Sequence, residues 1–597
     1  MGERRAFSEQ IREHGQALLL EALDSIPGAK AIVWDPQLMR RINLLTSVAV
    51  LNQRNVIFNL SINKPGDKRN DEVDTLVYLV GESNKSMNLL KECLNRSRTS
   101  QTHHIFFIPE MNFKRRAEIE QLRAAPKFAT SIQTFASLPI RWFPSPTQSP
   151  DVANMLVDDI IPRLVLDNDW TQLHKCADAL LKAESMMERR PTISYFGEWA
   201  TKMSGIVEQL RTAREDVSTE KSPSAEVLDI DEVLVIDRWT DPVTPLLLQR
   251  TFGGLLDEFF GIDEDEAIRV NDAEFSETEA AGSAEKRVSL RDDIFVDIRD
   301  KAVPADVGRE IRKITKELNE IEEECKSAQT VAEVKMSVKK IKELMKTKAL
   351  VSQHTRLCEM LKARQFDDFF HECNECAEEI LHGVPDKVVP FIEMSIIEGL
   401  DITEIIKLVC LHSLVCDGLR KETLDAYRKL IVDTYGSKCI PWLMCLQQAG
   451  LIREKGGETH LNSKNPIITG FAKTVKQMRL LIEETNALKP TDASYFYGGY
   501  ASLLVRHLEG HGTQWKTIQG ERLTLRNPKR MLFVVGGLTM AEIASIRFSL
   551  PDIKAICVTS TVTGTHFVRS FDQHGYAFKN AFASRTAWQQ NLVEVRW

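Results

Sequence analysis

Short apolar runs separated by helix-like segments occupy roughly the first 140 residues. Four of these runs, at residues 31–34, 56–58, 75–80 and 105–108, are strand-like. Each is a short apolar run typical of a strand. Because such strands alternate with helices, they favour a parallel, doubly wound sheet. We therefore predict an N-terminal α/β domain over residues 1–140.

A second alternating pattern begins at residue 141 and returns near the C-terminus. Apolar runs at residues 531–535 and 555–559 flank a helical segment, and we expect them to complete the sheet that begins before residue 237. The second α/β domain would then be discontinuous, formed by residues 141–237 and 525–597. A mainly helical domain, residues 238–524, would lie between its two parts.

The segment after residue 232 predicts a buried strand that leads into a buried helix. Residues 233–236 are continuously apolar, and Asp241-Pro242 must turn the chain, because proline cannot donate to a strand ladder. Pro245 suits the first turn of a helix. The apolar residues expected on that helix are Leu246, Leu247, Phe252, Leu255, Leu256 and Phe259.

The sharpest periodicity in the chain lies at residues 304–348. Apolar positions recur there every three or four residues on two successive segments, which predicts two helices in an antiparallel hairpin. Charged residues cover the remaining faces. Such faces are usually only solvated, but they can also set the register of a partner helix. The expected seam residues are Val307, Ile311, Ile314, Leu318, Ile321 and Cys325, then Val331, Val334, Val338, Ile341 and Met345.

The composition is that of an ordinary globular protein. The 597 residues are 43% hydrophobic and 27% charged, and the length suits about three or four domains. The net charge of -8 and the lack of a basic stretch with interleaved aromatics argue against nucleic-acid binding. No run reaches the roughly 18 apolar residues of a membrane span, so we expect membrane contact to come only through partners.

Candidate metal and phosphate sites are weak. The spacing H-x-C-x-x-C at residues 371–376 would need a fourth ligand from Cys358, His382 or Cys410, so buried thiols are favoured over zinc. The turn Gly536-Gly537 lacks the rest of a phosphate loop.

Two further polar features have simple explanations. Thr539 and Glu542 have the spacing of a helix capping box, which would account for the residues there. The acidic run at residues 263–266 is expected to be a solvated loop. We therefore expect no catalytic residue, no cofactor and no metal.

Three stretches carry a distinctive set of motifs: residues 237–246 (DRWTDPVTPL), 491–500 (TDASYFYGGY) and 535–548 (VGGLTMAEIASIRF). They resemble the signatures of the Sec/Munc (SM) family of SNARE-binding fusion proteins, in its class C vacuolar-protein-sorting branch. Residues 32–35 and 298–301 fit the same branch, so the resemblance covers most of the chain. It implies an arch-shaped, three-domain SM fold with two parallel-sheet α/β domains, a large mainly helical domain and no catalysis.

The same resemblance implies partners. SNARE helices would be templated on the hairpin, and a vacuolar-sorting subunit of the propeller-solenoid type would dock near Arg428, Tyr435 and Ile440. The complex would be an endolysosomal tether of the HOPS or CORVET kind. The chain would be cytoplasmic and would reach late endosome, lysosome or vacuole membranes through these partners. The candidate SNARE-binding residues are Lys313, Lys316, Lys335, Lys339 and Lys342.

Two alternatives stay open from the residues alone. The first is a nucleotide-dependent enzyme that uses the N-terminal doubly wound sheet. The absence of a Gly-rich turn after Trp34 or Val80 counts against it. The second is a helical scaffold that binds other partners and no SNAREs.

Overall fold

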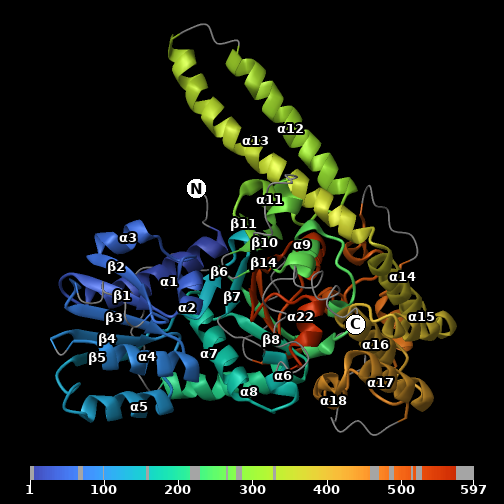
Figure 1. The fold of residues 1–597 in the computed structure, drawn as a ribbon, viewed down its shortest axis with the longest axis horizontal. Helices are drawn as coiled ribbons and strands as arrows, with labels where there is room; N and C mark the ends of the chain where they lie inside the picture. Colours follow the sequence, from blue (N-terminus) through green and yellow to red (C-terminus); the bar gives the residue numbers. More distant parts are fainter. Residues whose placement is uncertain are drawn as a thin grey trace, which may run out of the picture.

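A computed structural model describes residues 6–64, 72–98, 100–148, 150–155, 160–187, 189–215, 229–263, 266–276, 285–326, 331–456, 470–482, 490–511, 515–518 and 528–572. Two sheets flanked by helices lie beside a helical body, and one long helical hairpin projects away from them (Figure 1).

The first sheet contains five parallel strands in the order β2-β1-β3-β4-β5. The four expected strands are present as β1 to β4, which confirms the parallel α/β sheet. Strand β5 was not predicted from the sequence, because only its first residue is buried and its apolar pattern is therefore weak. Such low burial suits a strand at the edge of a sheet. The strands are β1 (Lys30–Trp34), β2 (Val56–Ser61), β3 (Thr75–Val80), β4 (Thr102–Phe107) and β5 (Ile132–Ser137). The helices are α1 (Phe7–Asp24), α2 (Pro36–Ile42), α3 (Val48–Gln53), α4 (Asn84–Arg96) and α5 (Phe113–Ala124).

The second sheet has seven strands in the order β12-β8-β9-β13-β14-β7-β6. Strands β13 and β14 come from the C-terminal part of the chain, yet they occupy the centre, where β13 pairs in parallel with both β9 and β14. The domain limits at residues 140, 237 and 524 stay predictions. The strands are β6 (Trp142–Pro144), β7 (Val152–Met155), β8 (Thr192–Phe196), β9 (Glu232–Asp237), β12 (Lys516–Ile518), β13 (Arg530–Val535) and β14 (Ile553–Val558). The helices around them are α6 (Ile160–Val165), α7 (Thr171–Ser185), α8 (Glu198–Glu215), α21 (Met540–Ser549) and α22 (Gly564–Arg569).

The helical body is built around α16 (Ile402–Val415), which is buried along nearly its whole length. Neither this helix nor any other in the described part of the chain is long and apolar enough to cross a membrane. The other main elements of this region are α9 (Phe252–Phe260), β10 (Ala267–Asn271), β11 (Glu285–Ser289), α11 (Asp293–Ile298), α14 (Asp368–His382), α15 (Pro385–Ile397), α17 (Lys421–Tyr435), α18 (Ile440–Gln448), α19 (Phe471–Met478) and α20 (Leu503–Leu508).

The prediction of a single helix after Pro245 is wrong. A 3-10 turn (Thr244–Leu246) is followed by extended backbone at Leu247, and α9 begins only after Thr251. The Thr251 hydroxyl accepts a hydrogen bond from the Gly254 N–H at 3.1 Å. The backbone N–H of Phe252 also donates to the Lys301 carbonyl, at 2.8 Å. This tertiary pairing and the helix cap together set the start of the helix.

The prediction of a solvated acidic loop at residues 263–266 is also wrong at its last residue. Residues 264–265 lie outside the described part of the chain. Glu266 is only 5% exposed. Its carboxylate accepts hydrogen bonds from the Ser145 hydroxyl at 2.7 Å and the Thr147 N–H at 2.6 Å. Burial raises the pKa of Glu266 to about 7. Glu266 is therefore a structural contact to the segment between β6 and β7.

The hairpin consists of α12 (Ala305–Lys326) and the longer α13 (Val331–Gln365), which runs well past the expected end at residue 348 (Figure 1). An ion pair between Lys348 and Glu322 links the two helices. On α12 the expected seam is largely confirmed, because Val307, Ile311, Leu318 and Cys325 are buried, although Ile321 is 38% exposed.

The prediction for the seam of α13 is wrong, because the helix is rotated about its axis relative to the expected orientation. Ile341 and Met345 are 39% and 66% exposed, whereas Leu344 is buried. The C-terminal half of α13 buries Leu357 and Leu361 in a core shared with α9 and α11. This contact determines which face of the helix turns inward. The side chains of Val331, Val334 and Val338 lie outside the described residues.

The rotation of α13 predicts opposite effects for two neighbouring substitutions. Leu344→Asp places a carboxylate against α12 and should loosen the hairpin, costing roughly 2–5 kcal/mol of local stability. Met345→Asp changes an exposed position and should stay within about 0.5 kcal/mol of wild type. Amide hydrogen exchange along α12 measures both. Faster exchange in the Met345 variant than in the Leu344 variant would contradict the observed rotation.

Candidate functional site

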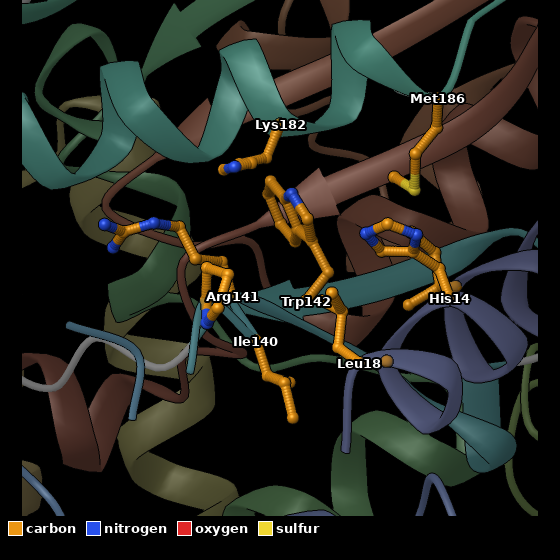
Figure 2. A pocket seen from close by; sticks show the side chains of 10 residues that line it. His14, Leu18, Ile140, Arg141, Trp142, Lys182 and Met186 are labelled. Carbon is orange, nitrogen blue, oxygen red and sulfur yellow. The ribbon is translucent and has the colours of Figure 1, made fainter. Parts of the chain in front are cut away.

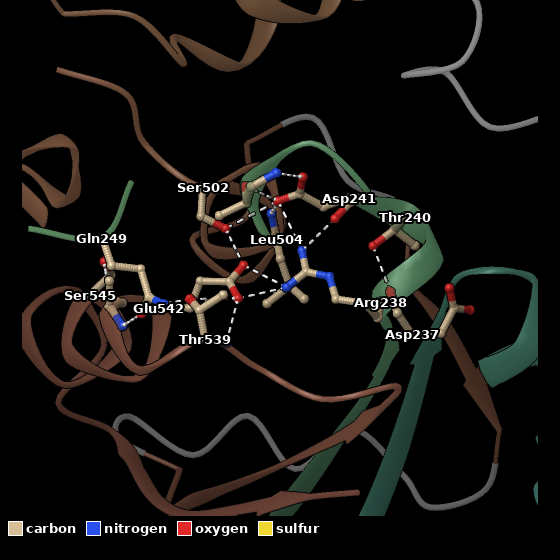
Figure 3. A network of polar contacts seen from close by, with 12 residues as sticks. Asp237, Arg238, Thr240, Asp241, Gln249, Ser502, Leu504, Thr539, Glu542 and Ser545 are labelled. Carbon is tan, nitrogen blue, oxygen red and sulfur yellow. Dashed lines mark hydrogen bonds and ion pairs between the residues drawn. The ribbon is translucent and has the colours of Figure 1, made fainter. Parts of the chain in front are cut away.

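A buried polar network joins the motif-bearing stretches at residues 237–246 and 535–548, together with residues 502–504, which follow the third stretch (Figure 3). Arg238 follows β9 and is fully buried. Its Nη1 donates to both carboxylate oxygens of Glu542, at 2.7 and 2.6 Å. Its Nη2 donates to the Asp241 carbonyl at 2.7 Å and lies 3.1 Å from the Asp241 carboxylate. Although burial disfavours a charged guanidinium, the two carboxylates keep the pKa of Arg238 above its usual value.

Neutral donors satisfy the remaining carboxylate oxygens. Asp241 accepts from the Thr244 N–H at 3.0 Å and the Leu504 N–H at 3.1 Å. The Ser502 hydroxyl lies 2.7 Å from Glu542 and 3.2 Å from Asp241, so it can bridge the two acids. These contacts offset the excess negative charge, because a buried carboxylate with several hydrogen bonds needs no second cation.

The capping box at the start of α21 is confirmed. The Thr539 hydroxyl accepts from the Glu542 N–H at 3.1 Å, and the Glu542 carboxylate accepts from the Thr539 N–H at 3.0 Å. Capping does not account for every residue there, however, because Glu542 is also the counter-ion of Arg238. No local pattern signals a partner that lies 304 residues away in the sequence.

The glycine pair before α21 serves close packing. A Cβ on Gly536 would lie 2.7 Å from Arg238 Cβ, and one on Gly537 would lie 2.6 Å from the Ser560 carbonyl oxygen. Both glycines have positive φ, at 99° and 89°. The turn is therefore occupied by protein atoms at the positions where a phosphate loop would need open space.

Asp237 precedes Arg238 and takes no part in that ion pair. Its carboxylate accepts hydrogen bonds from the Trp199 and Ala200 N–H groups at 2.9 and 3.1 Å, at the start of α8. Burial raises the pKa of Asp237 to about 7 despite these bonds. The residue anchors α8 to the end of β9.

A small pocket lies between α1, the segment at residues 139–142 and α7 (Figure 2). Its polar lining consists of His14, Arg141 and Lys182, beside the Trp142 indole. Burial, and then the charge of Lys182, lower the pKa of His14. None of the ten lining residues is a carboxylate, thiol or hydroxyl. The Trp142 indole N–H donates to the Ala179 carbonyl at 3.0 Å, so the ring is held against α7 on one side of the pocket.

The cysteine cluster on α14 does not converge with its histidine. Cys373 and Cys376 are buried, and burial raises the pKa of Cys376 to about 12. The His371 side chain is 58% exposed and lies 3.4 Å from Glu375. Within the described ranges, no group of three or more His, Cys, Asp or Glu side chains is placed to hold a metal ion.

The candidate SNARE-binding lysines are distributed over both helices of the hairpin. The Lys313 side chain is 66% exposed and lies 3.2 Å from Glu310. The Lys316 side chain is 80% exposed and lies 3.7 Å from Glu320. Lys342 on α13 is also exposed. Lys335 and Lys339 belong to α13 as well, but their side chains lie outside the described residues.

The candidate partner-subunit residues lie on α17 and at the start of α18. The Arg428 side chain is 42% exposed and lies 3.3 Å from Asp425. Tyr435 is half-buried, and its hydroxyl donates to the Leu400 carbonyl at 2.6 Å, which ties the end of α17 to the connection between α15 and α16. Ile440 is 41% exposed.

Three further apolar side chains on the adjoining helices are more exposed than Ile440. Met394 and Ile397 on α15 are 56% and 59% exposed, and Met444 on α18 is 62% exposed. Sequence reasoning missed all three. Their signal is a large apolar residue outside the buried stripe of its helix, which becomes visible only once that stripe is known.

Residues 30–570 match the model of the Sec1 family. The chain belongs to the Sec1 family. This confirms the resemblance to SM proteins seen in the motifs. The chain is 31% identical to vacuolar protein sorting-associated protein 33A of Caenorhabditis elegans, over 93% of this chain and 95% of that protein. It is 28% identical to the protein of the same name from Rattus norvegicus, over 90% of this chain and 92% of that protein.

Solved structures of Sec1-family proteins share the fold. The SM protein Vps45 in complex with the Qa SNARE Tlg2 aligns with a TM-score of 0.60 and 17% identity, over 96% of this chain and 99% of that one. The Unc18–syntaxin 1 complex from Monosiga brevicollis aligns with a TM-score of 0.60 and 13% identity, over 96% and 100%. The expected three-domain SM fold, with its α/β sheets and large helical part, is therefore confirmed.

The buried network predicts that Glu542 is a major stability determinant of this Sec1-family chain. Glu542→Ala leaves Arg238 buried with a single carboxylate, which should cost about 3–5 kcal/mol of unfolding free energy. The measurement is the midpoint of urea unfolding. Glu320→Ala is the control, because that side chain is 62% exposed, and its effect should stay within about 0.5 kcal/mol. Equal midpoints for the two variants would contradict the role of the network.

Proposed function

We propose that the chain is a non-catalytic SM protein that binds and templates SNARE helices for membrane fusion at endosomes and lysosomes or vacuoles. The observation that carries the proposal is the projecting hairpin α12–α13, on a fold shared with Vps45 in complex with Tlg2 and with Unc18 in complex with syntaxin 1. Its relatives named for vacuolar protein sorting favour the vacuolar pathway.

The exposed surface of the hairpin suits a guest helix. Ile321, Ile341 and Met345 are large apolar side chains that the hairpin leaves exposed. Exposed lysines such as Lys313 and Lys342 lie on the same two helices. An amphipathic helix can pack on such apolar anchors while its acidic side chains meet the lysines, which sets its register.

A second surface would hold a vacuolar-sorting subunit of the propeller-solenoid type. The residues we propose are Arg428, Tyr435 and Ile440, supported by the exposed Met394, Ile397 and Met444 on neighbouring helices. Exposed large apolar side chains of this kind are typical of a protein-protein interface. The assembly would be a tether of the HOPS or CORVET kind, held on late endosomal or lysosomal membranes.

The polar constellations in the described residues favour a binding protein over the nucleotide-dependent enzyme. Arg238 pairs with Asp241 and Glu542 in the interior, where neutral donors satisfy the remaining carboxylate oxygens. The turn at Gly536 is filled by neighbouring protein atoms. Both features serve packing, so the surfaces are the parts of the molecule that remain free to act.

The hairpin proposal predicts a charge-dependent loss of SNARE binding. Reversing Lys335, Lys339 and Lys342 to Glu should weaken binding of a SNARE motif, most clearly at low salt, because exposed pairs contribute about 0.2–1 kcal/mol each and are screened by ions. Binding is measured for wild type and variant at two ionic strengths.

The control for the hairpin variant reverses Lys473, Lys476 and Lys554, which are exposed and lie outside the hairpin helices α12 and α13. It has the same net charge as the test variant and should bind as wild type does. If the hairpin variant also binds as wild type does at both ionic strengths, its lysines are only solvated.

The partner-surface proposal predicts that Ile440→Asp abolishes co-purification of the propeller-solenoid subunit. A carboxylate buried without a partner at the centre of an interface costs several kcal/mol. Ile57→Asp is the matched control, since Ile57 is 55% exposed on the edge strand β2, and it should leave co-purification intact. Retained co-purification by a folded Ile440 variant would exclude this surface.

A further inference from the structure

One N-terminal segment of this acidic chain carries an excess of positive charge. Residues 84–127, which contain α4, β4 and α5, include nine Lys and Arg but only four Asp and Glu. The whole chain has 77 basic and 85 acidic residues. The α4–α5 segment therefore has a formal charge opposite in sign to that of the protein.

Helices α4 and α5 lie on a common face of the first sheet (Figure 1). Lys91 on α4 lies 3.7 Å from Glu118 on α5, and the Lys127 ammonium donates to the Asn95 carbonyl at 2.5 Å, so the helices lie side by side. Arg115 is buried between them and donates to the Glu82 carbonyl. The exposed cations of this face are Lys85, Arg96, Lys114, Arg116, Arg123 and Lys127.

Few carboxylates compensate these exposed cations. On α4 and α5 the exposed acids are Glu92 and Glu120. Glu92 lies 2.8 Å from Arg96, so that pair is neutral, which leaves Glu120 as the other exposed acid on these two helices. The remaining positive charge is available to an anionic partner.

An exposed aromatic side chain stands at the start of α5. Phe113, the first residue of α5, is 87% exposed, the largest value among the exposed large apolar residues of the described part of the chain. The preceding residue caps the helix, because the Asn112 side chain accepts from the Arg115 N–H at 2.9 Å. Lys114 and Arg116 follow Phe113 in the first turn and are also exposed. An exposed aromatic side chain next to cations is an arrangement that peripheral proteins use at the membrane interface.

We propose that the α4–α5 face binds an anionic lipid bilayer directly, with the cations on the headgroups and Phe113 in the interfacial region. Nucleic acids fit less well, because their single strands are held in grooves lined with several stacking aromatics, whereas this face is a convex helix pair with one projecting ring. The contact needs neither a SNARE nor a partner subunit. In Figure 1 it lies at the opposite end of the molecule from the hairpin tip, so the bound bilayer would leave the hairpin free.

Sedimentation of the full chain with vesicles tests the proposal. Wild type should bind vesicles of phosphatidylcholine mixed with phosphatidylserine, bind pure phosphatidylcholine far less, and lose affinity as salt rises. Reversing Lys85, Lys114 and Arg116 to Glu should weaken binding by at least about tenfold, because each cation near an anionic surface contributes roughly fivefold. Phe113→Ser should weaken binding also at high salt, where the apolar contact persists.

Two matched controls separate this surface from general charge and hydrophobicity. Reversing Lys362, Lys473 and Lys476 gives the same net charge, and Phe366→Ser removes another exposed phenylalanine, at 65% exposure. Both controls should bind as wild type does. Equal losses in test and control variants would overturn the proposal. So would equal binding to both vesicle types, or a nucleic acid that binds this face while phosphatidylserine vesicles do not.

Discussion

The buried ion pair between Arg238 and Glu542 is the contact on which the second α/β unit depends. Each charge would cost several kcal/mol in the interior without its partner, so neither β9 nor α21 can be buried alone. The pair joins residues 304 positions apart and places β13 next to β9 at the centre of the sheet. Formation of this sheet therefore has to wait for the C-terminal part of the chain.

The C-terminal part also positions the helical body. Lys407 on α16 lies 2.9 Å from Glu258 on α9, and Glu258 in turn accepts from the Gly564 N–H at 3.0 Å, at the start of α22. The Trp442 indole N–H donates to the Val568 carbonyl at 2.8 Å. Helix α22 thus contacts α18, which carries part of the proposed partner surface, and the buried pair of Lys407 and Glu258 positions its first residue.

The hairpin obtains its orientation at its base. His354 on α13 lies 2.9 Å from Asp292, and Leu357 packs in the core with Phe252 and Phe295. These contacts hold one face of a 35-residue helix against the body. Because an α-helix is stiff, they also determine which side chains the projecting part exposes. The exposure of Ile341 and Met345 therefore depends on contacts at the base of the hairpin, at His354 and Leu357.

Local pattern alone determined the strands β1, β3, β4, β9 and β13, the seam of α12 and the capping box of α21. These features depend on periodicity and on residues within one turn of each other, which a sequence displays directly. The motifs at residues 237–246 and 535–548 identified the family, but only folding brought Arg238 and Glu542 together. The rotation of α13 and the burial of Glu266 were likewise decided by tertiary contacts, because both depend on partners from distant segments that no local spacing reveals.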